Sequence, residues 1–247
     1  LRHRFTALER AKEQGIGHYF VPRYTRVVDT AESKDNINKA YNLISTSKVR
    51  NEMIIDDVIT CVARKQTPVI LTRFKEHAKF LHDALKEKAD HVFLLYGDNS
   101  DKENAEIRVK LKQIPENESL ILVATGQKIG EGFDFPRLDV LMLAAPVSFE
   151  GRLEQYVGRL NRDYVGKEAV YVYDYIDSHV RYFDKMYAKR LRTYRKMGFS
   201  IWTQELQPKQ IINAIFDSVN YTEKFEQDIV ESEKMVVISS PDIRQDK

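Results

Sequence analysis

The chain has 247 residues and a mass of 28.9 kDa; 43% of the residues are apolar and 31% charged, and the mean hydropathy is -0.47. These values are typical of one large or two small globular domains and exclude bulk disorder and collagen-like repeats. A single cysteine, Cys61, excludes an intramolecular disulfide and a cysteine-rich zinc site. The apolar stretches fall short of the roughly 20 residues that cross a bilayer, so we expect a cytoplasmic protein that uses no membrane.

Apolar runs that alternate with helical periodicity predict an α/β fold with a parallel sheet. In chain order, the expected strands are Tyr19 to Val28 (interrupted by Pro22), Pro68 to Leu71, Val92 to Tyr96, Leu120 to Ala124, Val140 to Leu143 and Ala169 to Tyr173. The expected helices are an amphipathic stretch capped by Ser33 and running through Ile44, then Met53 to Arg64, Lys75 to Lys88, one opened by the capping box Ser100/Glu103, and Pro208 to Val230. Residues 51–177 therefore read as one compact unit, 1–50 as a segment that leaves a preceding domain, and 178–247 as a helical extension whose last residues, Ser239 to Lys247, are disordered.

The net charge is only +2, but basic residues gather in one segment, His179 to Gly198. It contains Arg181, Lys185, Lys189, Arg190, Arg192, Arg195 and Lys196, against one acid, Asp184. Such a stripe is typical of a phosphate-binding surface, but also of an ordinary solvated helix face. The sequence leaves both interpretations open.

A polar row marks the predicted helix within Ser148 to Arg162. Gln155, Arg159 and Arg162 follow at i, i+4 and i+7 and so share one face, while Phe149, Leu153, Tyr156, Val157 and Leu160 share another. Gly158 lies beside the polar row, where the missing Cβ lets a ligand approach the backbone. Two convergent guanidiniums suit a triphosphate, although an ordinary surface helix produces such a row as well.

A glycine-containing loop follows the expected strand that ends near Thr125. It holds Gly126, Gly130, Gly132 and Asp134 before Pro136 and the next strand. Ligands of parallel sheets bind at the carboxyl ends of strands, where glycines let backbone N–H groups face phosphate. Thr125 is placed to donate to a nucleic-acid phosphate, and Asp134 to accept from a ribose or orient an arginine.

Together these two segments resemble motifs V and VI of superfamily 2 helicases. Motif VI, Q-x-x-G-R-x-x-R, is matched by Gln155, Gly158, Arg159 and Arg162, and motif V by Val123 to Thr125 and Gly132 to Pro136. Thr67 to Leu85 resembles motif IV with its helix, and Tyr96–Gly97 the next conserved turn. The stretch Glu131 to Asp134 is most similar to the UvrB and type III restriction-enzyme branch.

The resemblance implies a RecA-like C-terminal helicase lobe of the P-loop NTPase type. Arg159 and Arg162 would then be catalytic arginine fingers on the γ-phosphate of ATP. Nucleotide contacts would come from Gln155, Gly132, Asp134 and Gly158, and nucleic-acid contacts from Thr125, Arg73, Thr72 and Gly97. DNA is the expected partner, with RNA not excluded.

The sequence contains no G-x-x-x-x-G-K-[ST] loop and no Asp-Glu pair after a strand that would hold Mg²⁺. We therefore expect residues 1–50 to be the exit segment and linker of a missing N-terminal lobe, which holds ATP with Mg²⁺. The chain alone is then inactive, and it holds no metal of its own.

Two other functions fit parts of the pattern. One is a nucleic-acid-binding module without catalysis; the other is a nucleotide-sugar transferase, which leaves the paired arginines unexplained.

Several conspicuous residues are interpreted as structural. Cys61, on an apolar helix face, and Trp202 are expected in the core, and His77 lacks metal-ligand partners at suitable spacing. Asp56 and Asp57 are expected on a helix surface. Tyr171, Tyr173 and Tyr175 alternate along a strand and are expected to pack against the C-terminal helices.

Overall fold

The computed structural model describes residues 15–97, 99–126, 134–147, 150–162 and 164–202. The chain divides into a compact unit, Leu1–Thr203, and a second unit, Gln204–Lys247. The helix expected at Pro208 to Val230 and the tail from Ser239 lie outside the described residues, as do Phe149, Gly130 and Gly132.

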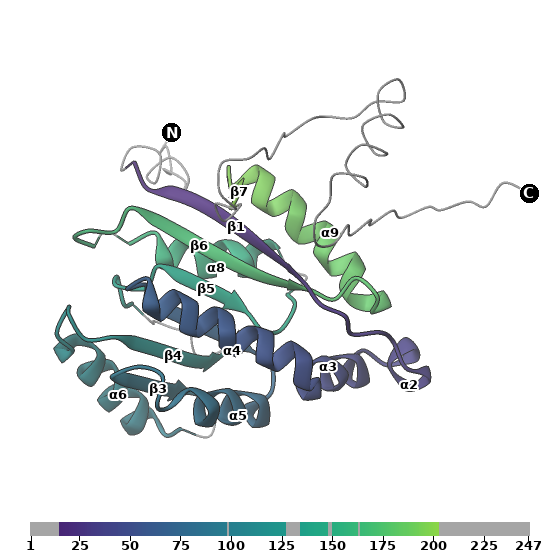
Figure 1. The fold of residues 1–247 in the computed structure, drawn as a ribbon, viewed down its shortest axis with the longest axis horizontal. Helices are drawn as coiled ribbons and strands as arrows, with labels where there is room; N and C mark the ends of the chain where they lie inside the picture. The colour runs from purple at the N-terminus through teal and green to yellow at the C-terminus, as the bar shows by residue number, and fades with distance from the viewer. Residues whose placement is uncertain (1–14, 98, 127–133, 148–149, 163, 203–247) are drawn as a thin grey trace, which may run out of the picture. The chain divides into compact units, whose positions relative to one another are not determined.

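The first unit is built on a seven-stranded parallel sheet with strand order β3-β4-β2-β5-β6-β1-β7 (Figure 1). Its strands are β1 (Gly17–Tyr24), β2 (Pro68–Thr72), β3 (His91–Leu95), β4 (Leu120–Thr125), β5 (Val140–Leu143), β6 (Ala169–Ile176) and β7 (Ser200–Ile201). The central strands β2, β4 and β5 are almost wholly buried, as expected of a parallel sheet covered on both faces. The predicted parallel α/β fold is confirmed.

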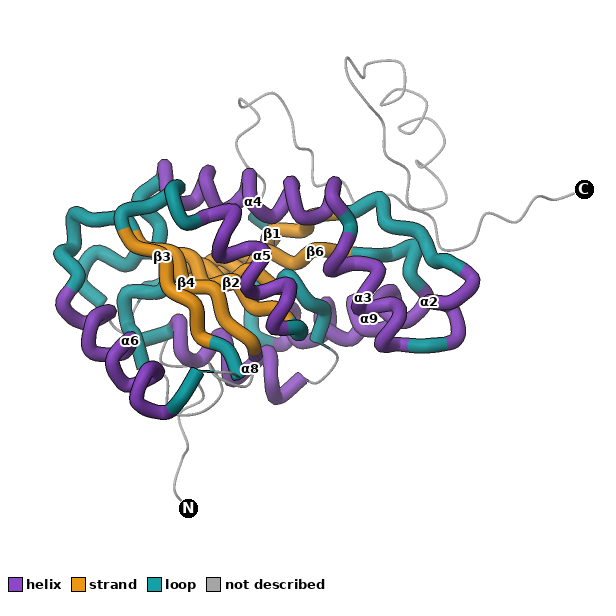
Figure 2. Tube along the Cα trace, turned by 90° about the horizontal axis from the view of Figure 1, so that it is seen from below, coloured by secondary structure: helices purple, strands orange, loops and turns teal. Residues whose placement is uncertain are grey.

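Helices cover both faces of this sheet (Figure 2). They are α2 (Ala31–Asp35), α3 (Ile37–Thr46), α4 (Lys48–Ala63), α5 (Lys75–Leu85), α6 (Asp101–Gln113), α8 (Glu150–Leu160) and α9 (Arg181–Lys196). One apolar core packs α4 and α5 against the sheet through Ile54, Val58, Leu81 and Leu85. The opposite core brings in α6, α8 and α9, for example through Leu111, Val157 and Tyr194.

A third, smaller core lies beyond the carboxyl ends of the strands. Tyr41 and Ile44 of α3 pack there against Val180 and Phe183 at the start of α9. In Figure 1, α3 extends past the ends of the central strands, so residues from the expected linker lie against the edge where ligands of parallel sheets bind.

The sheet crosses both domain boundaries expected from the sequence, because β1 and β7 join it. Pro22 does not interrupt β1, which pairs with β6 along its whole length. The amides of Gly17 and Thr25 donate to residues of β6 or next to it, so odd positions face β6 and Pro22 faces the other side. There β7 pairs only with Tyr19 and Phe20, and no donor is needed at Pro22.

Three local expectations need correction. Ser33 is not the helix cap: Thr30 caps α2, with Ser33 as the reciprocal third residue, and Asn36 caps α3. Tyr173 and Tyr175 belong to the core of α4 and α5, with Tyr171 packed against it, and not to the core that contains α9. The other helix expected to cover them, Pro208 to Val230, lies outside the described residues.

Asp57 is buried rather than on the helix surface. It accepts hydrogen bonds from Arg23 Nε at 2.8 Å and from the Tyr175 hydroxyl at 3.1 Å. Cys61 lies fully in the core as expected, and burial raises the pKa of its thiol to about 12. Among the described residues, no helix is long and apolar enough to cross a membrane.

Candidate functional site

Three neighbouring strands bring the predicted nucleic-acid residues to one edge of the sheet. Thr72 and Thr125 end β2 and β4 and are register partners. Leu95 of β3 pairs with Ala124, which places the turn containing Gly97 just past the same edge. Gly97 is exposed and the Thr125 side chain half-buried, whereas Thr72 is buried.

The buried Thr72 hydroxyl lies 2.7 Å from His77 Nδ1, and His77 Nε2 lies 2.9 Å from Asn51 Oδ1. Burial, together with the charge of Arg50, lowers the pKa of His77 to about 3. The imidazole is therefore neutral near pH 7, with Nε2–H donating to Asn51 and Nδ1 accepting from Thr72. The Thr72 side chain thus holds the end of β2 from within the core, and its hydroxyl does not face a nucleic-acid strand in the solvent.

Arg73, the next residue, is exposed and held by α3. Its guanidinium lies 4.4 Å from the centroid of the Tyr41 ring, and one of its nitrogens lies 3.4 Å from Asn38 Oδ1. The Tyr41 hydroxyl in turn donates to the carbonyl of Pro146, just past β5, at 2.8 Å. Sequence reasoning missed Tyr41, because no local signal links it to a residue so far along the chain.

A second cation is held against a tyrosine at the same edge. Lys79 Nζ of α5 lies 5.1 Å from the centroid of the Tyr96 ring, which follows β3. Stacked cations of this kind keep N–H donors directed outward, and basic groups interleaved with aromatic rings are typical of nucleic-acid-binding surfaces.

Helix α8 carries the predicted arginine row. Leu153, Tyr156, Val157 and Leu160 are buried in the core of α6, α8 and α9, so the expected apolar stripe is confirmed for these four residues. Gln155 is exposed, Arg159 is half-buried, and a Cβ at Gly158 would meet nothing within 4 Å. The helix ends at Leu160, so Arg162 lies just past its end and the expected row of three on one helix face is wrong for Arg162.

The predicted motif V and motif VI segments meet in space. Arg162 Nε lies 3.5 Å from Asp134 Oδ1, and both side chains are more than half exposed. The Tyr156 hydroxyl donates to the carbonyl of Gly126 at 3.1 Å, which ties α8 to the end of β4. A Cβ at Gly126 would lie 2.6 Å from that hydroxyl, so any other residue there would have to displace the tyrosine.

Lys167 also joins these two segments, and sequence reasoning did not identify it. Its ammonium group donates to the carbonyls of Leu160 at 2.8 Å and Arg162 at 3.1 Å, and to that of Pro136 in the segment after Asp134. A cation at a helix carboxyl end is favourable because the last carbonyls lack partners within the helix. Lys167 thus holds the ends of the Asp134 and Arg162 segments together.

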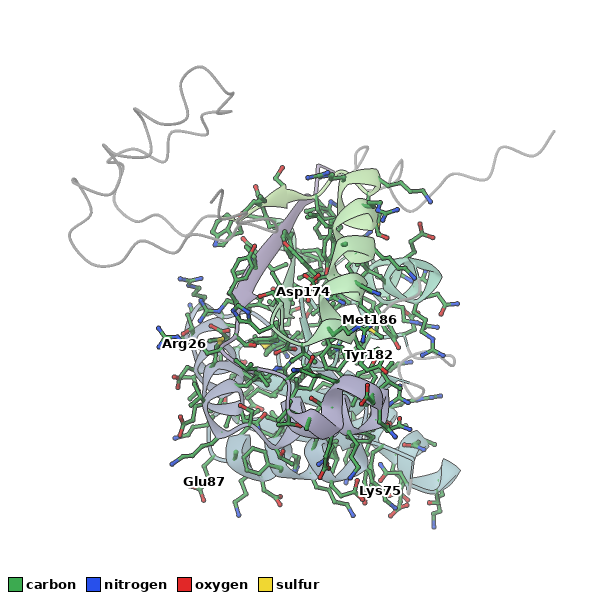
Figure 3. All side chains as sticks on the ribbon, turned by 90° about the vertical axis from the view of Figure 1, so that its right-hand side faces the viewer. Arg26, Lys75, Glu87, Asp174, Tyr182 and Met186 are labelled. Carbon is green, nitrogen blue, oxygen red and sulfur yellow. The ribbon has the colours of Figure 1, made fainter. Side chains whose placement is uncertain are left out.

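The basic helix α9 uses one of its cations inside the fold. Arg190 pairs with Asp174 through Nε–Oδ2 at 2.7 Å and Nη2–Oδ1 at 2.9 Å, and the Tyr194 hydroxyl donates to the same carboxylate. Figure 3 shows Asp174 in the interior, while Lys75 and Glu87 lie at the periphery. The other basic side chains, Arg181, Lys185, Lys189, Arg192, Arg195 and Lys196, are exposed. The helix therefore both braces the sheet and presents a basic face.

The described part of the chain holds no cluster of His, Cys, Asp or Glu that would bind a metal ion. The parallel sheet flanked by helices is a RecA-like fold, which two solved structures share. T4 UvsW has a similar fold (TM-score 0.58, 20% identity, over 76% of this chain and 41% of that one). So has the Sulfolobus solfataricus SWI2/SNF2 ATPase core in complex with dsDNA (TM-score 0.51, 13% identity, over 73% and 47%).

No family model matches the chain. Two of its curated relatives are viral proteins. Transcript termination protein A18 of Yaba-like disease virus is 28% identical over 172 residues, which are 65% of this chain and 35% of that protein. Putative helicase 161L of Invertebrate iridescent virus 6 is 33% identical over 118 residues, 47% of this chain and 22% of that protein. The chain spans about a third or less of the length of these relatives.

Proposed function

We propose that this chain is the C-terminal motor lobe of an ATP-dependent helicase or translocase that acts on nucleic acid. The observation that carries the proposal is the contact between the predicted motif V and motif VI segments. Asp134 and Arg162 lie 3.5 Å apart, and the Tyr156 hydroxyl of α8 donates to the carbonyl of Gly126, which follows Thr125 at the carboxyl end of β4. The carboxyl edge of the sheet thereby offers N–H and O–H donors for a nucleic-acid strand, and α8, which Tyr156 holds to this edge, offers guanidiniums for a nucleotide.

In this proposal Arg159 and Arg162 face the γ-phosphate of an ATP molecule whose Mg²⁺ and remaining contacts come from an N-terminal RecA-like lobe. A guanidinium placed there stabilises the charge that develops on the transferred phosphoryl group. Asp134 orients Arg162, and Gln155 and Gly158 line the approach of the nucleotide, together with Gly132, which lies outside the described residues. Alone, the chain supplies only half of such a site and is inactive.

Arg73, Thr125 and the Gly97 turn contact the phosphate backbone, while Thr72 acts through its buried bond to His77. Closure of the two lobes on ATP and their opening after hydrolysis would then change the grip on the strand. Lys167 and the Tyr156–Gly126 contact connect the residues proposed for ATP to those proposed for the nucleic acid, because they join α8 to the segments that follow β4.

The relatives favour a nucleic-acid substrate by name: one is a transcript termination protein and another a putative helicase. We propose that the nucleic acid is DNA, because the stretch Glu131 to Asp134 resembles the UvrB and type III restriction-enzyme branch.

The test uses the longer protein that carries this chain together with a lobe containing a P-loop. ATP hydrolysis should be stimulated by nucleic acid, and Arg159→Ala should lower kcat about 10³-fold or more while affinity for an ATP analogue changes little. Arg152→Ala, an exposed arginine on the same helix, is the matched control and should retain activity. Turnover that survives Arg159→Ala would show that the arginine is no finger.

A further inference from the structure

A groove lies beside Arg73, and nothing in the proposed ATP or phosphate contacts uses it. It has a volume of about 600 Å³ and is formed by the junction of α3 and α4 on one side and the first turns of α5 on the other. Its walls include Asn42, Ser45, Thr46, Phe74, His77 and Phe80. This volume is in the range of small-molecule sites in proteins.

The chemistry of the groove is that of an aromatic platform with a polar rim. Phe80 is 51% exposed, although large aromatic side chains are usually buried in a folded chain. Asn42 offers an exposed amide, which both donates and accepts hydrogen bonds. The Ser45 and Thr46 hydroxyls donate back to the carbonyl of Asn42, so their oxygens remain available as acceptors.

The floor of the groove is rigid. His77 is fixed between Thr72 and Asn51, and the Asn51 amide nitrogen donates to the Ser45 carbonyl at 2.9 Å. Since His77 is neutral, the floor carries no charge that would have to be desolvated when an uncharged planar group enters.

The rim carries positive charge where a phosphate would pass. Arg73 directly precedes Phe74 of the groove wall, and its guanidinium is held on Tyr41, the neighbour of Asn42. Lys48 lines the groove, and Lys79 lies one residue before Phe80 on α5; Glu76 is the acidic group of the lining. An apolar groove with cations at its mouth is complementary to an uncharged ring attached to a phosphate chain.

We infer that this groove receives an unstacked base of a single-stranded nucleic acid whose phosphate backbone is held by Arg73. The base stacks on Phe80, and Asn42 hydrogen bonds to its edge. The inference rests on the proposed nucleic-acid function and adds a base-binding subsite to it. Bases of DNA and RNA share the chemistry that the groove recognises, and the experiment distinguishes a DNA ligand from an RNA ligand.

The test is binding of labelled 20-nucleotide strands to the 247-residue chain by fluorescence anisotropy at fixed salt. The probes are dT20, rU20 and a 20-nucleotide strand of abasic sites with the same phosphates. Stacking of one base on an aromatic ring corresponds to roughly five- to 150-fold in affinity. The wild-type chain should therefore bind dT20 or rU20 more tightly than the abasic strand, and the tighter of the two identifies the strand.

Phe80→Ala should weaken binding of the preferred base-bearing strand about tenfold and leave the abasic strand unaffected, while Phe80→Tyr should retain wild-type affinity. Val109→Ala, which truncates a similarly exposed apolar side chain on α6, is the control and should change neither. Because Phe80 is half exposed, the melting temperature of Phe80→Ala should match that of the wild type.

Equal affinity of the wild-type chain for base-bearing and abasic strands would overturn the base site while leaving the proposed function intact. An equal loss on both strands, or no loss, in Phe80→Ala would overturn it too. No binding of any strand would reject the base site together with nucleic-acid binding by this lobe.

Discussion

Two groups of arginines in the described part of the chain are held in opposite ways. Arg50 and Arg190 are buried and each forms two hydrogen bonds to an aspartate at the end of β6, Asp177 or Asp174. Arg73 and Arg162 are exposed, one against a tyrosine ring and the other 3.5 Å from a carboxylate. The first group satisfies its donors within the fold, whereas the second keeps donors directed to solvent, which is where an anionic ligand must meet them.

The largest stability effect is expected for the buried pair of Arg50 and Asp177. Asp177 also accepts a hydrogen bond from the Thr25 hydroxyl at 2.6 Å, so Asp177→Asn leaves a buried guanidinium without its counter-charge. The free energy of unfolding should fall by about 3–5 kcal/mol in urea titrations. Asp134→Asn, the equivalent change in the open pair, should alter it by less than about 0.5 kcal/mol. Similar losses for both variants would contradict the distinction between the two groups.

Burial of His77, together with the charge of Arg50, makes the stability of the chain depend on pH. The pKa of His77 is about 3 in the folded chain and about 6.5 when unfolded, so between these values the unfolded chain binds a proton that the folded chain does not. The free energy of unfolding should therefore fall by about 1 kcal/mol per pH unit as the pH drops below 6.5. His77→Gln should remove this part of the slope, as measured by urea unfolding at several pH values; an unchanged slope would show that His77 does not resist protonation.

The contact between Gly126 and Tyr156 sets the position of the helix that carries the open arginines. Gly126→Ala should destabilise the chain by about 1 kcal/mol, because the new methyl group lies 2.6 Å from a buried tyrosine hydroxyl. Tyr156→Phe removes that oxygen, and the next ring atom lies 3.7 Å away. The double variant should therefore regain stability relative to Gly126→Ala alone. If the two costs simply add in thermal unfolding, the clash is not the cause.

The smallest effect is expected for the cation held on Tyr41. Arg73→Lys keeps the charge but loses the planar stacking, so binding of a single strand should weaken only a few-fold, with the salt dependence nearly unchanged. Arg73→Ala should weaken binding further, and the slope of log affinity against log salt concentration should become shallower by about one. Both are measured by titration at several salt concentrations, and identical results for Lys and Ala would rule out stacking as the reason for arginine.

The sequence predicts the sheet well and the pairing of charges poorly. Runs such as Val140 to Leu143 identify strands because a sheet covered on both faces needs apolar side chains on both. The capping box of Ser100 with Glu103 is also present as predicted, because it is a local interaction. Arg190 and Asp57, by contrast, look like surface residues, because their burial depends on partners from other elements. Alternation of the tyrosines on β6 indicates that they share a face, but not which helices cover that face.

The same reasoning explains the limits at the candidate site. The spacing of Gln155, Gly158 and Arg159 predicts their helix, but not that it ends before Arg162. Nor does the spacing contain the contacts of Lys167, which binds the carbonyl of Leu160 at this helix end. The groove beside Phe80 has no sequence signature, because its two walls come from separate helices.

The pairing of β1 with β6 has a consequence for how the chain reaches its fold. Gly17 pairs with Ala169 and Tyr24 with Ile176, so each contact closes a loop of 152 residues (169 − 17 and 176 − 24). Long-range parallel pairing of this kind forms slowly. During synthesis, β1 must wait as an unpaired strand until β6 has left the ribosome, and for that interval its apolar residues are open to wrong partners.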